Sequence, residues 1–219
     1  TFFMKVSGTL GFFLASIIMA RTMGADGYGT FEYAVSWVMI LGVLGKFGVD
    51  QLVVREAGKY RELNRPDLLK GFFYWGHRNV LVISLITAVV AGTIGWCLSE
   101  GSASVMGVTF LIAMVLVPLD SLTALKQGLI RASGRADVWQ VPMSLVRPLF
   151  FLFLLSLLVG AGVPLSPVLS IVLLVISTVG AFATGTFMVR RQYGQDFKSA
   201  SSTTYSRLWL RSSILFILL

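Results

Sequence analysis

Apolar stretches of about twenty residues or more recur along the chain, separated by shorter polar segments. A helix rises about 1.5 Å per residue, so a stretch of this length crosses the roughly 30 Å of hydrocarbon in a bilayer. The predicted fold is therefore an all-α polytopic membrane protein. Spanning helices are predicted at 1–22, 31–54, 73–98, 105–130, 138–160 and 165–189, and a seventh begins near 207.

Two kinds of connection alternate between these spans. The connections at 23–30, 99–107 and 160–167 are short and almost uncharged. The other three are basic and contain fourteen of the 18 lysines and arginines: Arg55, Lys59, Arg61, Arg65, Lys70, Arg78, Lys126, Arg131, Arg135, Arg190, Arg191, Lys198, Arg207 and Arg211. Cytoplasmic loops carry an excess of Lys and Arg, so we predict that the basic connections are cytoplasmic and that the first span runs outward.

The same pattern predicts the domain organisation. Residues 1–195 form a six-helix lobe, 196–206 form a Ser/Thr-rich cytoplasmic linker, and 207–219 begin a second lobe. The chain starts at Thr1 and stops after about nine apolar residues of a new span, so we expect a fragment of a two-lobe transporter. The stretch that begins at Pro66 predicts a further helix, which lies on the membrane surface before the third span.

Composition agrees with a membrane protein, because 56% of the residues are hydrophobic and 13% are charged. The net charge of +8 could attract nucleic acid. The cations lie mainly in alternate connections, however, which indicates the usual excess of Lys and Arg in the cytoplasmic loops of a membrane protein, so no nucleic-acid partner is expected. A single cysteine, Cys97, and a single histidine, His77, exclude a disulfide framework and a cysteine- or histidine-based metal centre. The sequence contains no Walker-type loop and no Ser-His-Asp set, so we predict no enzyme activity, no catalytic residue and no cofactor.

Five charged residues lie inside the predicted spans: Lys5, Lys46, Asp50, Asp120 and Arg147. A charge within a span costs roughly 2.5–3.5 kcal/mol on insertion scales, so each of these requires a reason. Arg147 lies on the order of 13 Å deep in its span, and Pro142 and Pro148 flank it. A helix bent at these prolines suits an arginine in a water-filled cavity, whereas a lipid-facing arginine that snorkels is the alternative.

The other four charges allow two readings each. Lys46 and Asp50 are four residues apart, which predicts that they share one helix face and either neutralise each other or face a cavity. Lys5 lies near the cytoplasmic end of the first span, where snorkelling is the alternative to a functional role. Asp120 follows Pro118 near the middle of the fourth span, and it is either the partner of a cation or a proton-coupling group.

Three cations against two acids give the predicted interior a net positive charge, which favours an anionic substrate with phosphate groups. We therefore predict Arg147, Lys46 and Lys5 as substrate-binding residues. Asp120 and Asp50 are the predicted coupling groups or charge partners.

Three stretches resemble one protein family. "ARTMGADGYGTFEYA" at 20–34 contains the pattern R-x-x-G-x-x-x-[YF]-G, "GVDQLVVREAGK" at 48–59 resembles the family's exit from span 2, and "LIRASGRADVWQVPMSLVRPLFFLFLL" at 129–155 resembles its connection between spans 4 and 5. The chain thus resembles a bacterial polysaccharide flippase, of the O-antigen type, in the multidrug/oligosaccharidyl-lipid/polysaccharide export superfamily. One departure is Ala25, where the family often has proline.

This resemblance implies two six-helix lobes around a central cavity, in the inner membrane of a bacterium. It implies alternating access, by which an undecaprenyl-diphosphate-linked oligosaccharide is flipped to the outer leaflet for the synthesis of lipopolysaccharide O-antigen. The implied partners are this anionic lipid-linked oligosaccharide, membrane lipids and the polysaccharide polymerase machinery. Two alternatives stay open: a cation-coupled drug exporter of the same fold, which would favour acids over cations, and an integral-membrane polymerase or ligase, which would need a large external loop.

Overall fold

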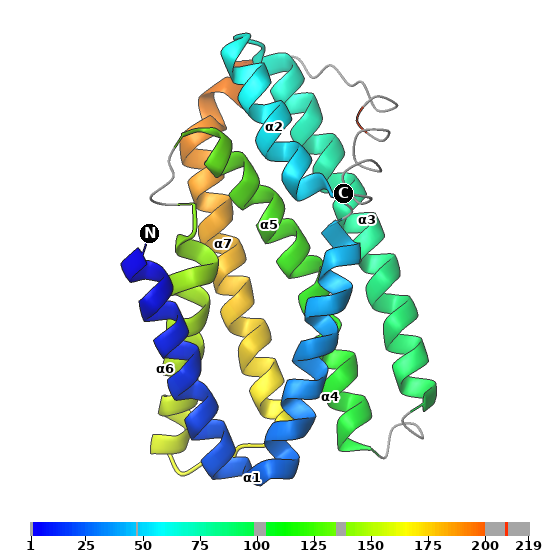
Figure 1. Ribbon diagram of the computed structural model, residues 1–219, viewed down its shortest axis with the longest axis vertical. Helices are drawn as coiled ribbons and strands as arrows, with labels where there is room; N and C mark the ends of the chain where they lie inside the picture. Colours follow the sequence, from blue (N-terminus) through cyan, green and yellow to red (C-terminus); the bar gives the residue numbers. More distant parts are fainter. Residues whose placement is uncertain (1, 47, 99–103, 135–138, 200–208, 210–219) are drawn as a thin grey trace.

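The computed structural model describes residues 2–46, 48–98, 104–134, 139–199 and 209. Every regular element in these residues is a helix, which confirms the all-α prediction (Figure 1). Five helical segments are long and apolar enough to cross a membrane: Phe2–Lys46, Pro66–Leu98, Val105–Ala132, Pro142–Gly160 and Pro167–Tyr193. The protein is therefore a multi-pass membrane protein.

The first element, α1 (Phe2–Lys46), is a hairpin of two helical arms joined at Gly24. Gly24 has φ 71° and ψ −178°, a conformation that glycine adopts at little cost and other residues avoid. Phe12 and Phe31 lie on different arms, yet both ring centroids are 6.2 Å from that of Phe151. Nineteen residues of straight helix would separate them by about 28 Å, so the arms fold back around one partner.

This hairpin explains why the structure does not confirm six spanning helices. The predicted reversal covered residues 23–30, but the helical hydrogen bonding continues up to and beyond a single bent residue. The first two predicted spans are therefore the two arms of one 45-residue element. The arrangement in two lobes stays a prediction.

The helix α2 (Val49–Glu62) follows a break at Gly48, which has φ 65°. After it, α3 (Pro66–Leu98) runs for 33 residues without interruption. The predicted surface helix at Pro66 is therefore wrong, because this stretch is the first part of α3. Its apolar side chains, including Leu69 and Phe72, are buried in the bundle rather than laid on the membrane.

The predicted fourth span is divided into α4 (Val105–Ala113) and α5 (Leu116–Ala132). Pro118 has no amide hydrogen for the carbonyl oxygen of Met114, which instead accepts a hydrogen bond from the Val117 amide at 3.2 Å. Proline therefore tightens the turn and separates the two helices.

Proline also shapes the next span. It begins with a π-helical turn, η1 (Pro142–Val146), continues as α6 (Arg147–Gly160), and is followed by α7 (Pro167–Ser199). A Cβ added to Gly8 of α1 would lie only 1.9 Å from the carbonyl oxygen of Ser144. The glycine thus allows α1 to approach the backbone of η1 directly.

The connections gather at the two ends of the bundle (Figure 1). One end holds the bend of α1, the start of α4 and the link from α6 to α7. The other holds α2, the start of α3, the end of α5 and the end of α7, so the described parts of the three basic connections share it. This arrangement agrees with the alternation of basic and uncharged connections in the sequence, while the orientation in the membrane stays a prediction.

Two hydrophobic clusters form the core. One surrounds Phe151 and joins both arms of α1 to α4, α6 and α7. The other surrounds Phe72 at the α2 end and includes Trp209, whose Nε1 donates a 2.8 Å hydrogen bond to the hydroxyl of Tyr60. The rest of the predicted start of a second lobe, and most of the predicted linker, lie outside the described residues, so this division stays a prediction.

Candidate functional site

An arginine is held inside the bundle where the π-helical turn becomes α6. Arg147 follows η1 directly and Pro148 comes next, so a proline fixes the backbone on the carboxyl side of the arginine. Because a proline ring cannot fit against the carbonyl four residues earlier in a regular helix, the wider turn accommodates Pro148 after Ser144. The sequence therefore builds an irregular turn that presents Arg147.

Arg147 forms an ion pair with Asp120, from the first part of α5. Its Nη1 lies 3.2 Å from Oδ2 and 3.3 Å from Oδ1 of the carboxylate. The two side chains are only 14% and 17% exposed. One guanidinium nitrogen thus serves both oxygens, in a part of the bundle that is largely closed to solvent.

Most of the guanidinium donors are not used by this pair. Among the described residues, Nη1 is the only nitrogen of Arg147 that finds a hydrogen-bond acceptor, and Nε is buried without one. The Arg147 Cζ atom lies 6.0 Å from the centroid of the Phe12 ring. A guanidinium carries five N–H donors in a fixed plane, so the group keeps free capacity for an oxyanion.

Lys46, at the end of α1, is the second cation near Asp120. It interacts electrostatically with the Asp120 carboxylate, as Arg147 does. The approach depends on Gly45, because a Cβ there would lie 2.7 Å from Oγ of Ser121 in α5. Arg147 is thus ion-paired with Asp120, Lys46 adds a second positive charge in the surroundings of the same carboxylate, and Lys46, Asp120 and Arg147 together have a net charge of about +1.

The prediction that Lys46 and Asp50 share a helix face is wrong. The break at Gly48 separates the end of α1 from α2, so the two side chains are not on one continuous helix. Asp50 lies in the first turn of α2, where its Oδ1 accepts a 3.0 Å hydrogen bond from the amide of Gln51. Among the described residues, no ion pair links Asp50 to Lys46.

Lys5 lies apart from this cluster. It is exposed near the start of α1, and within the described part of the chain it forms no ion pair or hydrogen bond. The structure thus brings together three of the five predicted residues, namely Lys46, Asp120 and Arg147. A role for any of them in substrate binding stays a prediction.

Lys126 is a further cation inside the bundle, although its place in a basic connection predicts a cytoplasmic residue. It is 4% exposed, its Nζ donates a 2.6 Å hydrogen bond to Oγ1 of Thr186, and Nζ lies 3.1 Å from the centroid of the Phe182 ring. Its charged neighbour is a cation, Arg190 of α7. Helical periodicity could have revealed it, because Leu122 and Leu129, one turn away on either side, are also buried.

The unused guanidinium donors of Arg147 and the nearby ammonium group of Lys46 are of the chemical type that binds an anion. The described residues contain no group of three His, Cys, Asp or Glu that could hold a metal ion. A protein-family model described as "Polysaccharide biosynthesis protein" matches residues 1–219, the whole of the chain. No curated protein and no solved structure matches significantly.

Proposed function

The chain belongs to the polysaccharide biosynthesis protein family of flippases, and from this premise we propose that it flips an undecaprenyl-diphosphate-linked oligosaccharide across the bacterial inner membrane. The oligosaccharide would be a repeat unit of a surface polysaccharide such as O-antigen. The enzymes that polymerise the delivered units are the proposed downstream partners. The protein itself would break no covalent bond.

The observation that carries this proposal is the partly unused guanidinium of Arg147. A diphosphate is a compact anion, and planar N–H donors match its oxygens in pairs. Arg147 has donors to spare, and Lys46 adds a second positive charge beside the same carboxylate. Together they supply the attraction that would take the charged head of the lipid into the bundle.

Asp120 gives the site a resting state. Without substrate, its carboxylate stabilises Arg147, which would otherwise be an uncompensated cation in a region largely closed to water, and it attracts the nearby Lys46. A diphosphate would compete with Asp120 for the same donors. Exchange between the two anions would couple substrate binding to movement of α5 against α6, as alternating access requires.

The drug-exporter alternative has weaker support. A cation-coupled exporter needs an acid that is free to exchange a proton or metal cation. Asp120 is instead paired with Arg147 and influenced by Lys46. The balance of charges in the described site therefore favours an anionic substrate.

Export of surface polysaccharide by a bacterial strain that lacks its own flippase tests the proposal in the natural protein. We expect Arg147→Ala to abolish export and Arg147→Lys to retain part of it, because lysine keeps the charge but loses the planar fork. Arg147→Ala should still insert at a normal level, since Lys46 remains near Asp120 to balance it. The matched control is Arg191→Ala, an exposed cation of α7, which should export normally.

The double variant Arg147→Ala with Asp120→Ala separates the proposal from a purely structural ion pair. If the pair only holds α5 to α6, removing both partners restores export. If Arg147 binds the substrate, export stays abolished although the protein is present in the membrane. Recovery of export in the double variant would therefore overturn the proposed role of Arg147.

A further inference from the structure

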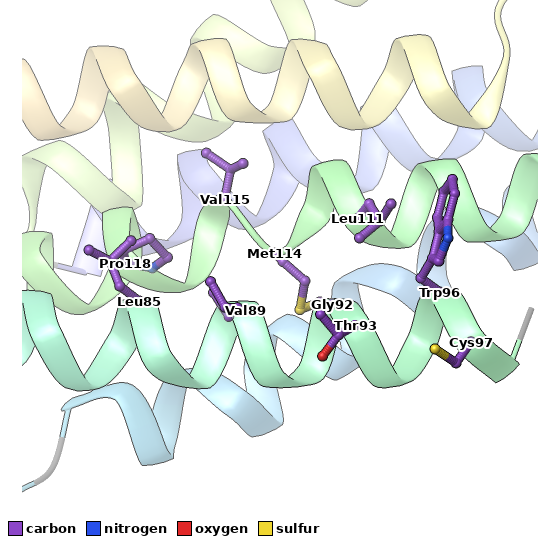
Figure 2. Close-up of a pocket in the computed structure, with 11 residues that line it drawn as sticks. Leu85, Val89, Gly92, Thr93, Trp96, Cys97, Leu111, Met114, Val115 and Pro118 are labelled. Atoms are coloured by element: carbon purple, nitrogen blue, oxygen red, sulfur yellow. The ribbon is translucent and has the colours of Figure 1, made fainter. Parts of the chain in front are cut away.

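A groove lies between α3 and the α4–α5 segment. Figure 2 shows side chains from both segments facing the space between them. Its volume is about 620 Å³, within the range of small-molecule sites. The residues that define it are Leu85, Val89, Thr93, Leu111, Met114 and Val115.

Small residues and the helix break create this space. Gly92 faces Leu111, and a Cβ on this glycine would lie 3.3 Å from the leucine Cδ2. Pro118, which separates α4 from α5, lines the same groove. The local irregularity that divides the predicted span thus also leaves room beside α3.

The groove offers little to a polar occupant. Its lining contains no charged residue, and the hydroxyl of Thr93 already donates a 2.9 Å hydrogen bond to the carbonyl of Val90. A polar group placed here would lose its hydrogen bonds to water and gain few in return, which is costly. A hydrocarbon occupant has no such penalty.

The length of the groove and the apolar surface beside it favour a lipid chain as the occupant. The groove runs along α3 from Leu85 to Cys97, about 18 Å of helix, which is close to the roughly 15 Å depth of one bilayer leaflet. Its mouth is continuous with an apolar surface of α3 that includes Ile86 and Val90, which are 58% and 50% exposed. In a membrane this surface contacts lipid, so lipid chains are the hydrocarbon that lies next to the groove and can enter it.

We propose that this groove is a binding site for a single acyl chain of a bilayer phospholipid. The headgroup would lie at the Trp96 end, since tryptophan prefers the membrane interface. In the predicted topology this end of α3 faces outward, so the lipid belongs to the outer leaflet. The proposal depends on the apolar groove and not on the substrate of the Arg147 site.

Photo-crosslinking in vesicles tests this site. The protein is reconstituted into phosphatidylethanolamine and phosphatidylglycerol with a small amount of phosphatidylcholine that carries a diazirine midway along one acyl chain. After illumination, mass spectrometry locates the labelled residues. We expect labelling of Val89 and Val115 to exceed, by several-fold, that of Phe153 and Leu157 on α6, which are similarly exposed.

Two tryptophan variants supply the matched comparison. Val89→Trp fills the groove and should reduce labelling of Val115 several-fold, whereas Val90→Trp, on the neighbouring lipid-facing position, should leave it unchanged. Equal labelling of groove and α6 in the unaltered protein would overturn the proposal, even if Val89→Trp does not insert. Crosslinks from the groove to a second copy, or labelling unaffected by Val89→Trp, would also overturn it.

Discussion

Replacing Gly8 by alanine tests how closely the packing of α1 against η1 is fixed. The added Cβ would lie 1.9 Å from the Ser144 carbonyl oxygen and 3.3 Å from Cγ of Pro148. Because such contacts are normally at least about 3 Å, the backbones must separate by about 1 Å or the turn must deform. The obstruction is backbone, so no side chain can rotate away from it.

Two opposing contributions determine the expected change in the free energy of unfolding for Gly8→Ala. Overpacking in a closely packed contact costs about 1–3 kcal/mol. Alanine in place of a helical glycine recovers about 0.5–1 kcal/mol. The net destabilisation is therefore up to about 2.5 kcal/mol, which lowers the unfolding temperature by up to several degrees in a chain of this size.

Gly42, in the other arm of the same helix, is the matched control. It is buried, yet a Cβ built there meets nothing within 4 Å. Gly42→Ala should therefore raise the unfolding temperature slightly, since only the helix-propensity term remains. The two variants should move in opposite directions when purified protein in detergent is heated and the fraction that stays monodisperse is measured.

The Gly8 variant should also lower export, because Arg147 follows the displaced turn directly, three residues after Ser144. Equal stability of Gly8→Ala and Gly42→Ala would refute this reasoning. It would mean that α1 and η1 are not in direct backbone contact.

Three further predictions concern charge and orientation. Asp120→Asn leaves Arg147 and Lys46 without their shared carboxylate, so we expect a loss of about 3–5 kcal/mol and less protein in the membrane; an unchanged level on a quantitative blot would contradict this. Lys126→Met should raise the unfolding temperature, because it removes a buried charge whose charged neighbour is another cation. The control Lys59→Met, at an exposed position, should change the free energy of unfolding by less than about 0.5 kcal/mol. A lower unfolding temperature for Lys126→Met would show that the charge stabilises the fold. In a Cys97→Ser background, Ala161→Cys should react with an impermeant thiol reagent added to intact cells and Arg61→Cys should not, and the reverse result would show that the topology is inverted.

The overall architecture could be predicted from the sequence because the membrane leaves few choices. Long apolar stretches must be helical, and the basic residues mark alternate connections. The details at Gly24 and Pro118 could not be predicted in the same way. Three glycines lie within residues 24–29, and only the packing of both arms against Phe151 decides which of them bends.

The candidate site was accessible to prediction only in part. The depth and charge of Arg147 and Asp120 single them out in the sequence, but their mutual contact depends on the arrangement of α5 and α6. Lys46 approaches Asp120 because Gly45 allows α1 to reach α5, not because of the spacing to Asp50. The burial of Lys126 was not predicted, because its charge resembles that of the adjacent basic connection, whereas Leu122 and Leu129 on the same helix face indicate a buried position.

The contact between α1 and η1 also joins two elements that are synthesised at different times. Gly8 and Pro148 are separated by 140 residues of chain, and ribosomes add roughly 5–20 residues per second. The face of α1 that carries Gly8 and Gly11 therefore enters the membrane roughly 7–28 s before η1 and Pro148, against which it packs, have been synthesised. During that interval neighbouring nascent chains on the same messenger RNA present the same bare face, so Gly8 and Gly11 are where premature pairing between copies would begin.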